Sequence, residues 1–265
     1  MAKILFLDSE CNSLDTELGF IQELAWAIYD SGTKRLLKCS SHILDWGGMH
    51  YDVEPGALQV TGLSKEFCQE TGRPAQLVFE ELLLDLAKVD AVAGHNIIEY
   101  DLKILNSNIK RSLYAEPTSL NEKFIFHTIW DCPYENPRQI MSLKYLAYDH
   151  GFILTNAHEA LADVLACAHV FFKYPFKTCY EIASTPLVTL HGYTVYQDEE
   201  GREAFYRQKF RWNRDNRRWE KKCRAYYIPG TQLELKGQDL FMTLENKEMI
   251  IRQNSPDASA PNEPI

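Results

Sequence analysis

Two carboxylic acids stand side by side at the end of an apolar run near the start of the chain, in the segment ILFLDSEC. Residues i and i+2 of a β-strand point to the same face of its sheet, so a strand here would place Asp8 next to Glu10. Two such carboxylates repel each other, and they gain from burial only when a cation lies between them. The pair therefore has two interpretations: a turn-capping Asp8 beside a solvated Glu10, or half of a metal site.

Further acids and one histidine in similar settings favour the metal site. Asp101 opens a predicted helix after the strand DAVAGH, and Asp163 lies on an otherwise apolar helix face, where an isolated carboxylate is costly. Three Asp and one Glu supply the hard oxygen ligands that Mg²⁺ or Mn²⁺ prefer. Two such ions, about 3.5–4 Å apart, can hold the attacking and leaving oxygens of a phosphodiester. A neutral histidine can serve as a general base, although His158 taken alone fits an N-terminal helix cap or a surface residue better.

The surrounding sequence predicts the elements that would position these side chains. Three β-strands come first, and helices then alternate with single strands, which indicates an α/β layered fold. Strands are expected at 3–8, 20–30, 35–44, 90–95 and 123–131, and helices within 63–74 and at 76–89, 99–113, 142–151 and 157–174.

Composition and charge limit the class of protein. No apolar stretch reaches the roughly 20 residues that a membrane span needs, and no secretory signal is visible. The seven cysteines are scattered without a CxxC pair, which favours free thiols in a cytoplasmic protein. The net charge of −9 disfavours nucleic acid as a partner, but it is unevenly spread. Residues 1–184 hold 25 acids against 15 bases, whereas residues 202–224 hold 10 bases against 3 acids.

The chain after residue 184 follows a different pattern. The sequence predicts a domain over 1–184, a small β-rich module over 185–253 and a disordered tail over 254–265. Short strands are expected at 193–198, 204–213, 218–228, 231–237 and 239–246.

A hairpin predicted at 209–223 alternates aromatic residues with Arg and Lys. The rings fit a small core or base stacking, and the charges fit a solvated face or phosphate binding. If this hairpin binds nucleic acid, the residues expected to contact it are Arg211, Trp212, Arg214, Arg217, Arg218 and Trp219.

Three motifs in order make residues 3–173 resemble the DEDDh family of 3′–5′ exonucleases. They are FLDSECNSLD with its DxE core, GHNIIEYDLKIL, and HEALADV with an HxAxxD pattern. The resemblance implies a ribonuclease H-like mixed sheet of five strands, flanked by helices, whose first three strands are antiparallel. The chain departs from the family pattern at Cys11-Asn12-Ser13-Leu14, where many members carry Thr-Thr-Gly-Leu.

The resemblance also implies a mechanism, in which a 3′ end is hydrolysed with release of nucleoside 5′-monophosphates. Asp8, Glu10 and Asp163 would hold one Mg²⁺ or Mn²⁺ ion, and Asp8 would bridge to a second ion that Asp101 helps to hold. His158 would take the proton from the attacking water. The expected substrate is a single-stranded nucleic acid or a 3′ overhang; DNA is favoured over RNA, but the sequence does not decide between them. The implied substrate contacts are Glu10, Asn12, Leu14 and Asn96.

Two other functions stay open at this point. A nucleic-acid-binding or partner-binding protein on an inactive nuclease fold is disfavoured because all five expected catalytic residues are present. A phosphodiesterase for short oligonucleotides is disfavoured by the basic module. A prokaryotic or phage-encoded context is favoured. A homodimer, or a replication or repair protein as partner, is left open.

Overall fold

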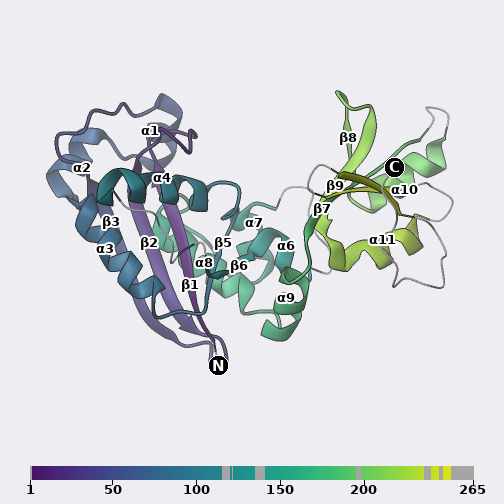
Figure 1. Ribbon diagram of the computed structural model, residues 1–265, viewed down its shortest axis with the longest axis horizontal. Helices are drawn as coiled ribbons and strands as arrows, with labels where there is room; N and C mark the ends of the chain where they lie inside the picture. The colour runs from purple at the N-terminus through teal and green to yellow at the C-terminus, as the bar shows by residue number, and fades with distance from the viewer. Residues whose placement is uncertain are drawn as a thin grey trace. The chain divides into compact units, whose positions relative to one another are not determined.

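The computed structural model describes residues 2–114, 120, 122–134, 141–194, 198–235, 240–244 and 247–251. Their contacts divide the chain into two compact units, residues 1–179 and 180–265, each with its own sheet (Figure 1). The predicted tail at 254–265 lies outside the described residues. Within the described part of the chain, no helix is long and apolar enough to cross a membrane.

The N-terminal unit is built on a mixed sheet with the strand order β4-β3-β2-β1-β5-β6. The first three strands are antiparallel, and the next two run parallel to β1, as predicted. The two-residue β4 at the edge adds a sixth strand, which sequence patterns did not indicate. The strands are β1 (Lys3–Cys11), β2 (Ile21–Asp30), β3 (Leu36–Asp45), β4 (Arg73–Pro74), β5 (Ala91–Gly94) and β6 (Phe124–His127).

Helices cover both faces of this sheet, which explains why β1 and β2 are apolar on both sides. Leu5 and Leu7 belong to a core that also contains Leu82 of α3 and Ile104 of α4. Phe6 points the other way and packs against Phe171 of α8, with ring centroids 5.5 Å apart. The helices are α1 (Pro55–Thr61), α2 (Lys65–Thr71), α3 (Ala75–Leu86), α4 (Asp101–Leu113), α6 (Thr128–Asp131), α7 (Leu143–Asp149) and α8 (Ala160–Phe171).

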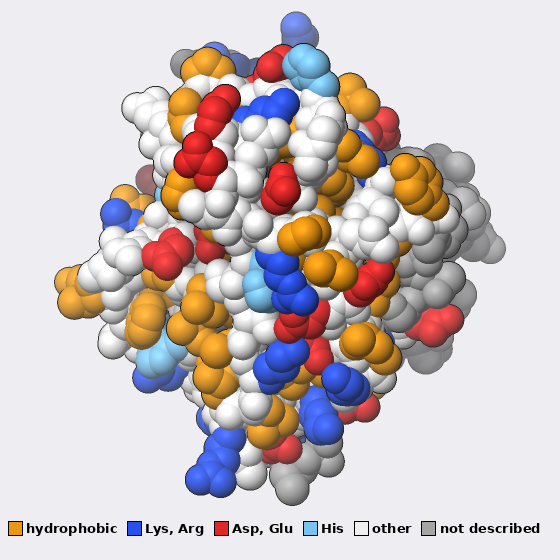
Figure 2. Space-filling view, turned by 90° about the vertical axis from the view of Figure 1, so that its left-hand side faces the viewer, with side chains coloured by type: hydrophobic (Ala, Val, Ile, Leu, Met, Phe, Trp, Pro, Cys, Tyr) orange, Lys and Arg blue, Asp and Glu red, His pale blue; other side chains and the backbone are white. Residues whose placement is uncertain are grey.

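Strand alternation places Asp8 and Glu10 on the same side as Phe6, facing α8. Most predicted elements are present with ends shifted by one to three residues. The strand expected at 123–131 is wrong beyond His127, because the chain turns there into the short α6. On the face of this unit in Figure 2, acidic, basic and apolar side chains are interspersed, so this face offers no continuous basic surface.

The C-terminal unit holds an antiparallel sheet with the order β11-β10-β7-β9-β8, and its small core contains Val188, Leu190, Phe205, Phe210 and Trp219. Its elements are β7 (Leu187–Gly192), α10 (Glu199–Arg207), β8 (Arg211–Asn213), β9 (Arg218–Arg224), the 3-10 turn η1 (Ala225–Tyr227), α11 (Ile228–Glu234), β10 (Leu240–Leu244) and β11 (Lys247–Ile251). The helix α9 (Phe176–Ala183) spans the boundary between the units.

Four strand predictions in this unit are wrong in whole or in part. The strand expected at 193–198 is replaced by β7, which ends at Gly192, and the strand expected at 218–228 ends at Arg224, where η1 follows. Residues 204–207 belong to α10, because the apparent turn at Glu199–Gly201 is a helix start, where the Asp198 carboxylate accepts a hydrogen bond from the backbone of Gly201. The acids of the first turn further stabilise the positive end of the helix dipole. Residues 231–234 lie in α11, which begins with a proline in its first turn, a position that suits proline.

Candidate active site

The sheet brings its acids together at the carboxyl end of β1. Asp8 and Glu10 lie two residues apart on one face of this strand. β5 runs parallel beside β1 and ends at Gly94, and the chain then enters α4 through Asp101, a carboxylate that is only 4% exposed. The Ser9 hydroxyl donates to Asp101 over 2.7 Å, which holds that carboxylate against the end of β1.

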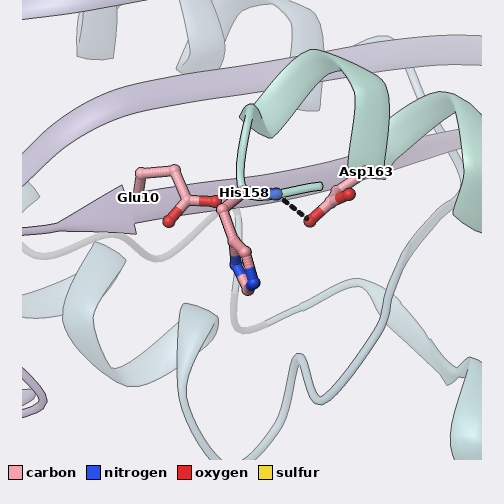
Figure 3. A group of neighbouring side chains, drawn as sticks. All are labelled: Glu10, His158 and Asp163. Atoms are coloured by element: carbon pink, nitrogen blue, oxygen red, sulfur yellow. Dashed lines mark hydrogen bonds between the residues drawn. The ribbon is translucent and has the colours of Figure 1, made fainter. Parts of the chain in front are cut away.

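The third motif completes the cluster from α8, which covers the same face of the sheet. Ligand atoms of Glu10, His158 and Asp163 all lie within 4.8 Å of one another, and Figure 3 shows the three side chains at the start of α8. His158 has a left-handed backbone (φ 69°), and its N–H donates to Asp163 over 3.3 Å. The other carboxylate oxygen, Asp163 Oδ1, is buried and has no hydrogen-bond partner among the described residues.

The electrostatics of the cluster are those of crowded acids in a poorly solvated site. Burial, followed by the charges of neighbouring acids, raises the pKa of Asp8 well above its usual value and that of Glu10 to about 8. Burial also raises the pKa of Asp101 to about 7, against the lowering effect of the Ser9 hydrogen bond. The pKa of Asp163 is raised by the same cause.

This arrangement fits a divalent cation. The donor set consists of hard carboxylate oxygens, which are the preferred ligands of Mg²⁺ and Mn²⁺. A bound cation would offset the mutual repulsion of the carboxylates and satisfy the unpartnered oxygen of Asp163. The structure thus brings together the five predicted catalytic residues, Asp8, Glu10, Asp101, His158 and Asp163.

Glu23 belongs to this cluster but is missing from the predicted site. It lies opposite Glu10 in the β1–β2 pairing and is 7% exposed. Its carboxylate accepts from the Ser41 hydroxyl over 3.1 Å and from the N–H of Ala160 over 3.3 Å. The signal in the sequence is an acid within the mostly apolar run of β2, but its partner in α8 is visible only in three dimensions.

The predicted substrate contacts of the N-terminal unit fall into two groups. Asn12 is buried, because its amide donates to the carbonyl of Asp52 and accepts from the N–H of Phe20, each over 2.6 Å. It therefore holds the loop after β1, and the prediction that it contacts substrate is corrected to a positioning role. Leu14 is 83% exposed and Asn96 is exposed in a left-handed conformation (φ 61°), so both side chains are accessible and stay predicted contacts.

The predicted contacts of the C-terminal unit also divide by burial. Trp219 is 2% exposed, its ring stacks on Phe205 and its N–H donates to Thr194, so the prediction that it stacks a base is wrong. Arg218 is half-buried and paired with Glu220 over 2.6 Å, which offsets part of its charge, and it stays a predicted contact. The accessible members of the predicted set are Arg211, Trp212, Arg214 and Arg217.

Comparison with known proteins places this chain in a family. Residues 5–171 match the RNase_T family, described as exonuclease, and the chain belongs to this family. The predicted ribonuclease H-like fold and the predicted membership of an exonuclease family are thereby confirmed. No match was found among curated protein sequences.

Solved structures of exonuclease I share the fold. One structure of exonuclease I, which suggests how the processivity of that enzyme is achieved, has a TM-score of 0.58 and 16% identity over 73% of this chain and 49% of that one. A complex of E. coli exonuclease I with a dA16 oligonucleotide has a TM-score of 0.57 and 17% identity over 72% of this chain and 48% of that one. A zinc-bound form of the E. coli enzyme with single-stranded DNA has the same TM-score, identity and coverage. This chain therefore spans about half the length of the exonuclease I chains.

Proposed function

We propose that this protein is a metal-dependent 3′–5′ exonuclease that hydrolyses single-stranded DNA and releases nucleoside 5′-monophosphates. The observation that carries the proposal is the convergence of Glu10, His158 and Asp163 within 4.8 Å, beside the half-buried Asp8 and the buried Asp101. Crowded carboxylates with raised pKa values next to a histidine make a site for cation-assisted proton transfer, and they have no evident use in packing.

Each residue has a proposed role that follows from its position. Asp8, Glu10 and Asp163 would hold one Mg²⁺ or Mn²⁺ ion, and Asp8 and Asp101 a second. Such ions, when bound, activate a water and stabilise the negative charge that develops on the phosphate. His158 is exposed at the mouth of the cluster, where it can accept the proton of the attacking water. Ser9 and Glu23 position Asp101 and α8.

The choice of DNA rests on the structures that share the fold. Similar structures are complexes of E. coli exonuclease I with dA16 and dT13 oligonucleotides, which supports a single DNA strand as the substrate. We assign the chemistry to residues 1–184 and assign a second contact with the strand to residues 185–253, where exposed arginines lie at the β8–β9 turn.

Digestion of a 5′-labelled single strand with Mg²⁺ tests the proposal. The wild type should shorten the strand from its 3′ end, and Asp8→Asn should abolish this reaction while the protein stays folded. Uracil-containing RNA of the same sequence tests the preference for DNA. Hydrolysis that persists in both Asp8→Asn and His158→Ala would overturn the site, and binding without hydrolysis by the wild type would favour an inactive nuclease fold.

A further inference from the structure

A hollow of about 330 Å³ lies on the surface of the N-terminal unit, lined by Lys144, Tyr145, Tyr148, Ile153 and Leu154. We call these five residues the tyrosine groove. Tyr148 is 69% exposed, Ile153 is 75% exposed and Tyr145 is 49% exposed, so the groove gathers several exposed apolar side chains into one patch. The groove takes no part in the chemistry proposed above. Resting on the proposed function, we propose that it holds bases of the single strand upstream of the 3′-terminal nucleotide, with Lys144 at a phosphate.

The groove exists because α7 is amphipathic. Leu143, Leu146 and Ala147 are buried on the side of α7 that packs against α8. Lys144, Tyr145 and Tyr148 occupy the opposite side, at the spacing of three and four residues that aligns side chains along a helix. The wall formed by Ile153 and Leu154 follows the glycine at position 151, which has a left-handed backbone (φ 79°) and turns the chain back along the helix.

The groove lies at the same edge of the sheet as the acids. Phe6 pairs with Ala93 across β1 and β5, so Asp8 and His95 each lie two residues beyond this pair. The His95 ring is in contact with the carbonyl of Met141 over 2.7 Å, just before α7 begins. The start of α7 is therefore fixed at the carboxyl end of the parallel strands, where α/β sheets bind their ligands.

The few residues between the groove and His158 limit the distance that a bound strand must span between them. Leu154 is four residues before His158, and four residues span at most about 14 Å. At the roughly 3.4 Å spacing of stacked nucleotides, this is about four nucleotides. A strand whose 3′ end lies at His158 thus reaches the groove within about four nucleotides, and a dinucleotide is the short substrate for comparison.

The chemistry of the groove suits nucleotides of any sequence. Tyrosine rings stack on bases because every base has a π-face, and an exposed lysine neutralises a phosphate. The rings are held on a rigid base, since Phe152 packs on His169 and its N–H donates to the carbonyl of Ala147 over 2.8 Å. An ordered aromatic surface loses little entropy when a base stacks on it.

Steady-state kinetics on two substrate lengths test the inference. Tyr148→Ala should raise KM for a 5′-labelled dT12 strand about tenfold, leave kcat nearly unchanged, and leave kcat/KM for the dinucleotide unchanged. Tyr148→Trp should restore the wild-type KM. Leu84→Ala is the matched control, because it removes a side chain of similar exposure (65%) from α3 and should change neither constant. Affinity for dT12 measured with Ca²⁺ should show the same order among the variants.

Three results separate this inference from the proposed function. An unchanged KM and affinity for dT12 in Tyr148→Ala would overturn the groove as a base site and leave it as a surface for a protein partner. An equal loss on the dinucleotide would also overturn it, because the defect would then lie at the reaction centre. Absence of hydrolysis by the wild type would overturn the proposed function alone, since the Ca²⁺ binding measurements would still test the groove.

Discussion

Glu23 lies directly opposite Glu10 in the β1–β2 pairing, and its carboxylate accepts a hydrogen bond from the first N–H of α8. Glu10 thus faces the reaction centre, while Glu23 holds α8, the helix that supplies Asp163, in position. The contact also places a negative charge at the positive end of the α8 dipole, which stabilises the helix start.

Replacement of Glu23 should therefore affect both stability and activity. Glu23→Ala leaves the Ala160 N–H and the Ser41 hydroxyl without their acceptor, which should cost about 1–3 kcal/mol in the free energy of unfolding. Urea denaturation measures this loss. A fall in kcat is also expected, because α8 carries His158 and Asp163. Ser41→Ala serves as control, since it removes only one of the two donors, and an effect as large as that of Glu23→Ala would contradict the tie to α8.

The metal-free protein should lose stability as the pH rises. The folded-state pKa values of Glu10 and Asp101 are raised to about 8 and about 7, so the folded protein binds more protons than the unfolded chain between roughly pH 4 and 8. The stability that these two groups contribute is therefore greatest below about pH 4 and falls as the pH rises from there through 8. Thermal melts in EDTA measure this, and each kcal/mol of stability that disappears should lower Tm by about 2–4 °C.

When Mn²⁺ replaces EDTA in these melts, the loss of stability at high pH should be reversed, because the cation binds the ionised carboxylates. The gain in Tm on adding Mn²⁺ should be larger at pH 8 than at pH 5.5. In Asp8→Asn, the gain at pH 8 should shrink, since the cluster has one ligand fewer. Equal stabilisation of wild type and variant at both pH values would show that the ion binds elsewhere.

The order of the elements in the N-terminal unit could be predicted because its signals are local. Alternating apolar residues define β1 and β2, and the acid at position 8 follows an apolar run that only a buried strand explains. The proximity of the acids followed from motif order and resemblance. The hydrogen bonds of Ser9 and Glu23 could not be predicted, because they join residues 92 and 137 positions apart.

The C-terminal unit was harder to predict because its local signals conflict. Glu199, Glu200 and Gly201 read as a turn, yet Asp198 caps a helix there. Trp212 and Trp219 look equivalent in the sequence, but Trp212 is 42% exposed while Trp219 lies in the core. The two residues pair across β8 and β9, and the helix α10 covers only one of them: Phe205 and Tyr206 pack on Trp219. Tertiary packing decides which of the two tryptophans is buried, and the pattern of residues in the sequence does not show this difference.

The same difference in burial predicts opposite effects of two alanine substitutions. Trp219→Ala should destabilise the C-terminal unit by about 3–5 kcal/mol, because it leaves a cavity beside Phe205 and Phe210. Trp212→Ala should change its stability by less than about 1 kcal/mol. Circular dichroism during urea denaturation of the full chain measures both, and comparable losses would contradict the assignment of Trp219 to the core.

His158 should contribute to the rate and hardly at all to metal binding. His158→Ala is expected to lower kcat by about 10²–10⁴-fold, the usual contribution of a general base. The affinity for Mn²⁺, measured by calorimetry, should change little, because the carboxylates supply the ligands. Because the His158 side chain is exposed to solvent, its removal leaves no cavity in the core, and the Tm of the variant should match that of the wild type. A large loss of Mn²⁺ affinity would instead make this histidine a ligand.

The arginines at the β8–β9 turn should govern how strongly salt weakens binding to a long strand. Arg214 and Arg217 are exposed, and neither is needed for the core. Removing one cation that neutralises a phosphate of a single strand reduces the slope of log K against log salt by about 0.7. Arg214→Ala combined with Arg217→Asn should thus flatten the slope by about 1.4, twice that value. Asparagine is chosen at position 217 because the backbone there is left-handed (φ 50°).

Lys3→Ala removes an exposed charge at the amino end of β1 and is the control for the arginine pair. Anisotropy of a labelled dT30 strand at several salt concentrations gives the slopes for the wild type, the double variant and the control. The control should keep the wild-type slope, because its charge lies at the end of β1 opposite to the acids. Equal slopes in all three proteins would show that the β8–β9 turn binds no phosphate.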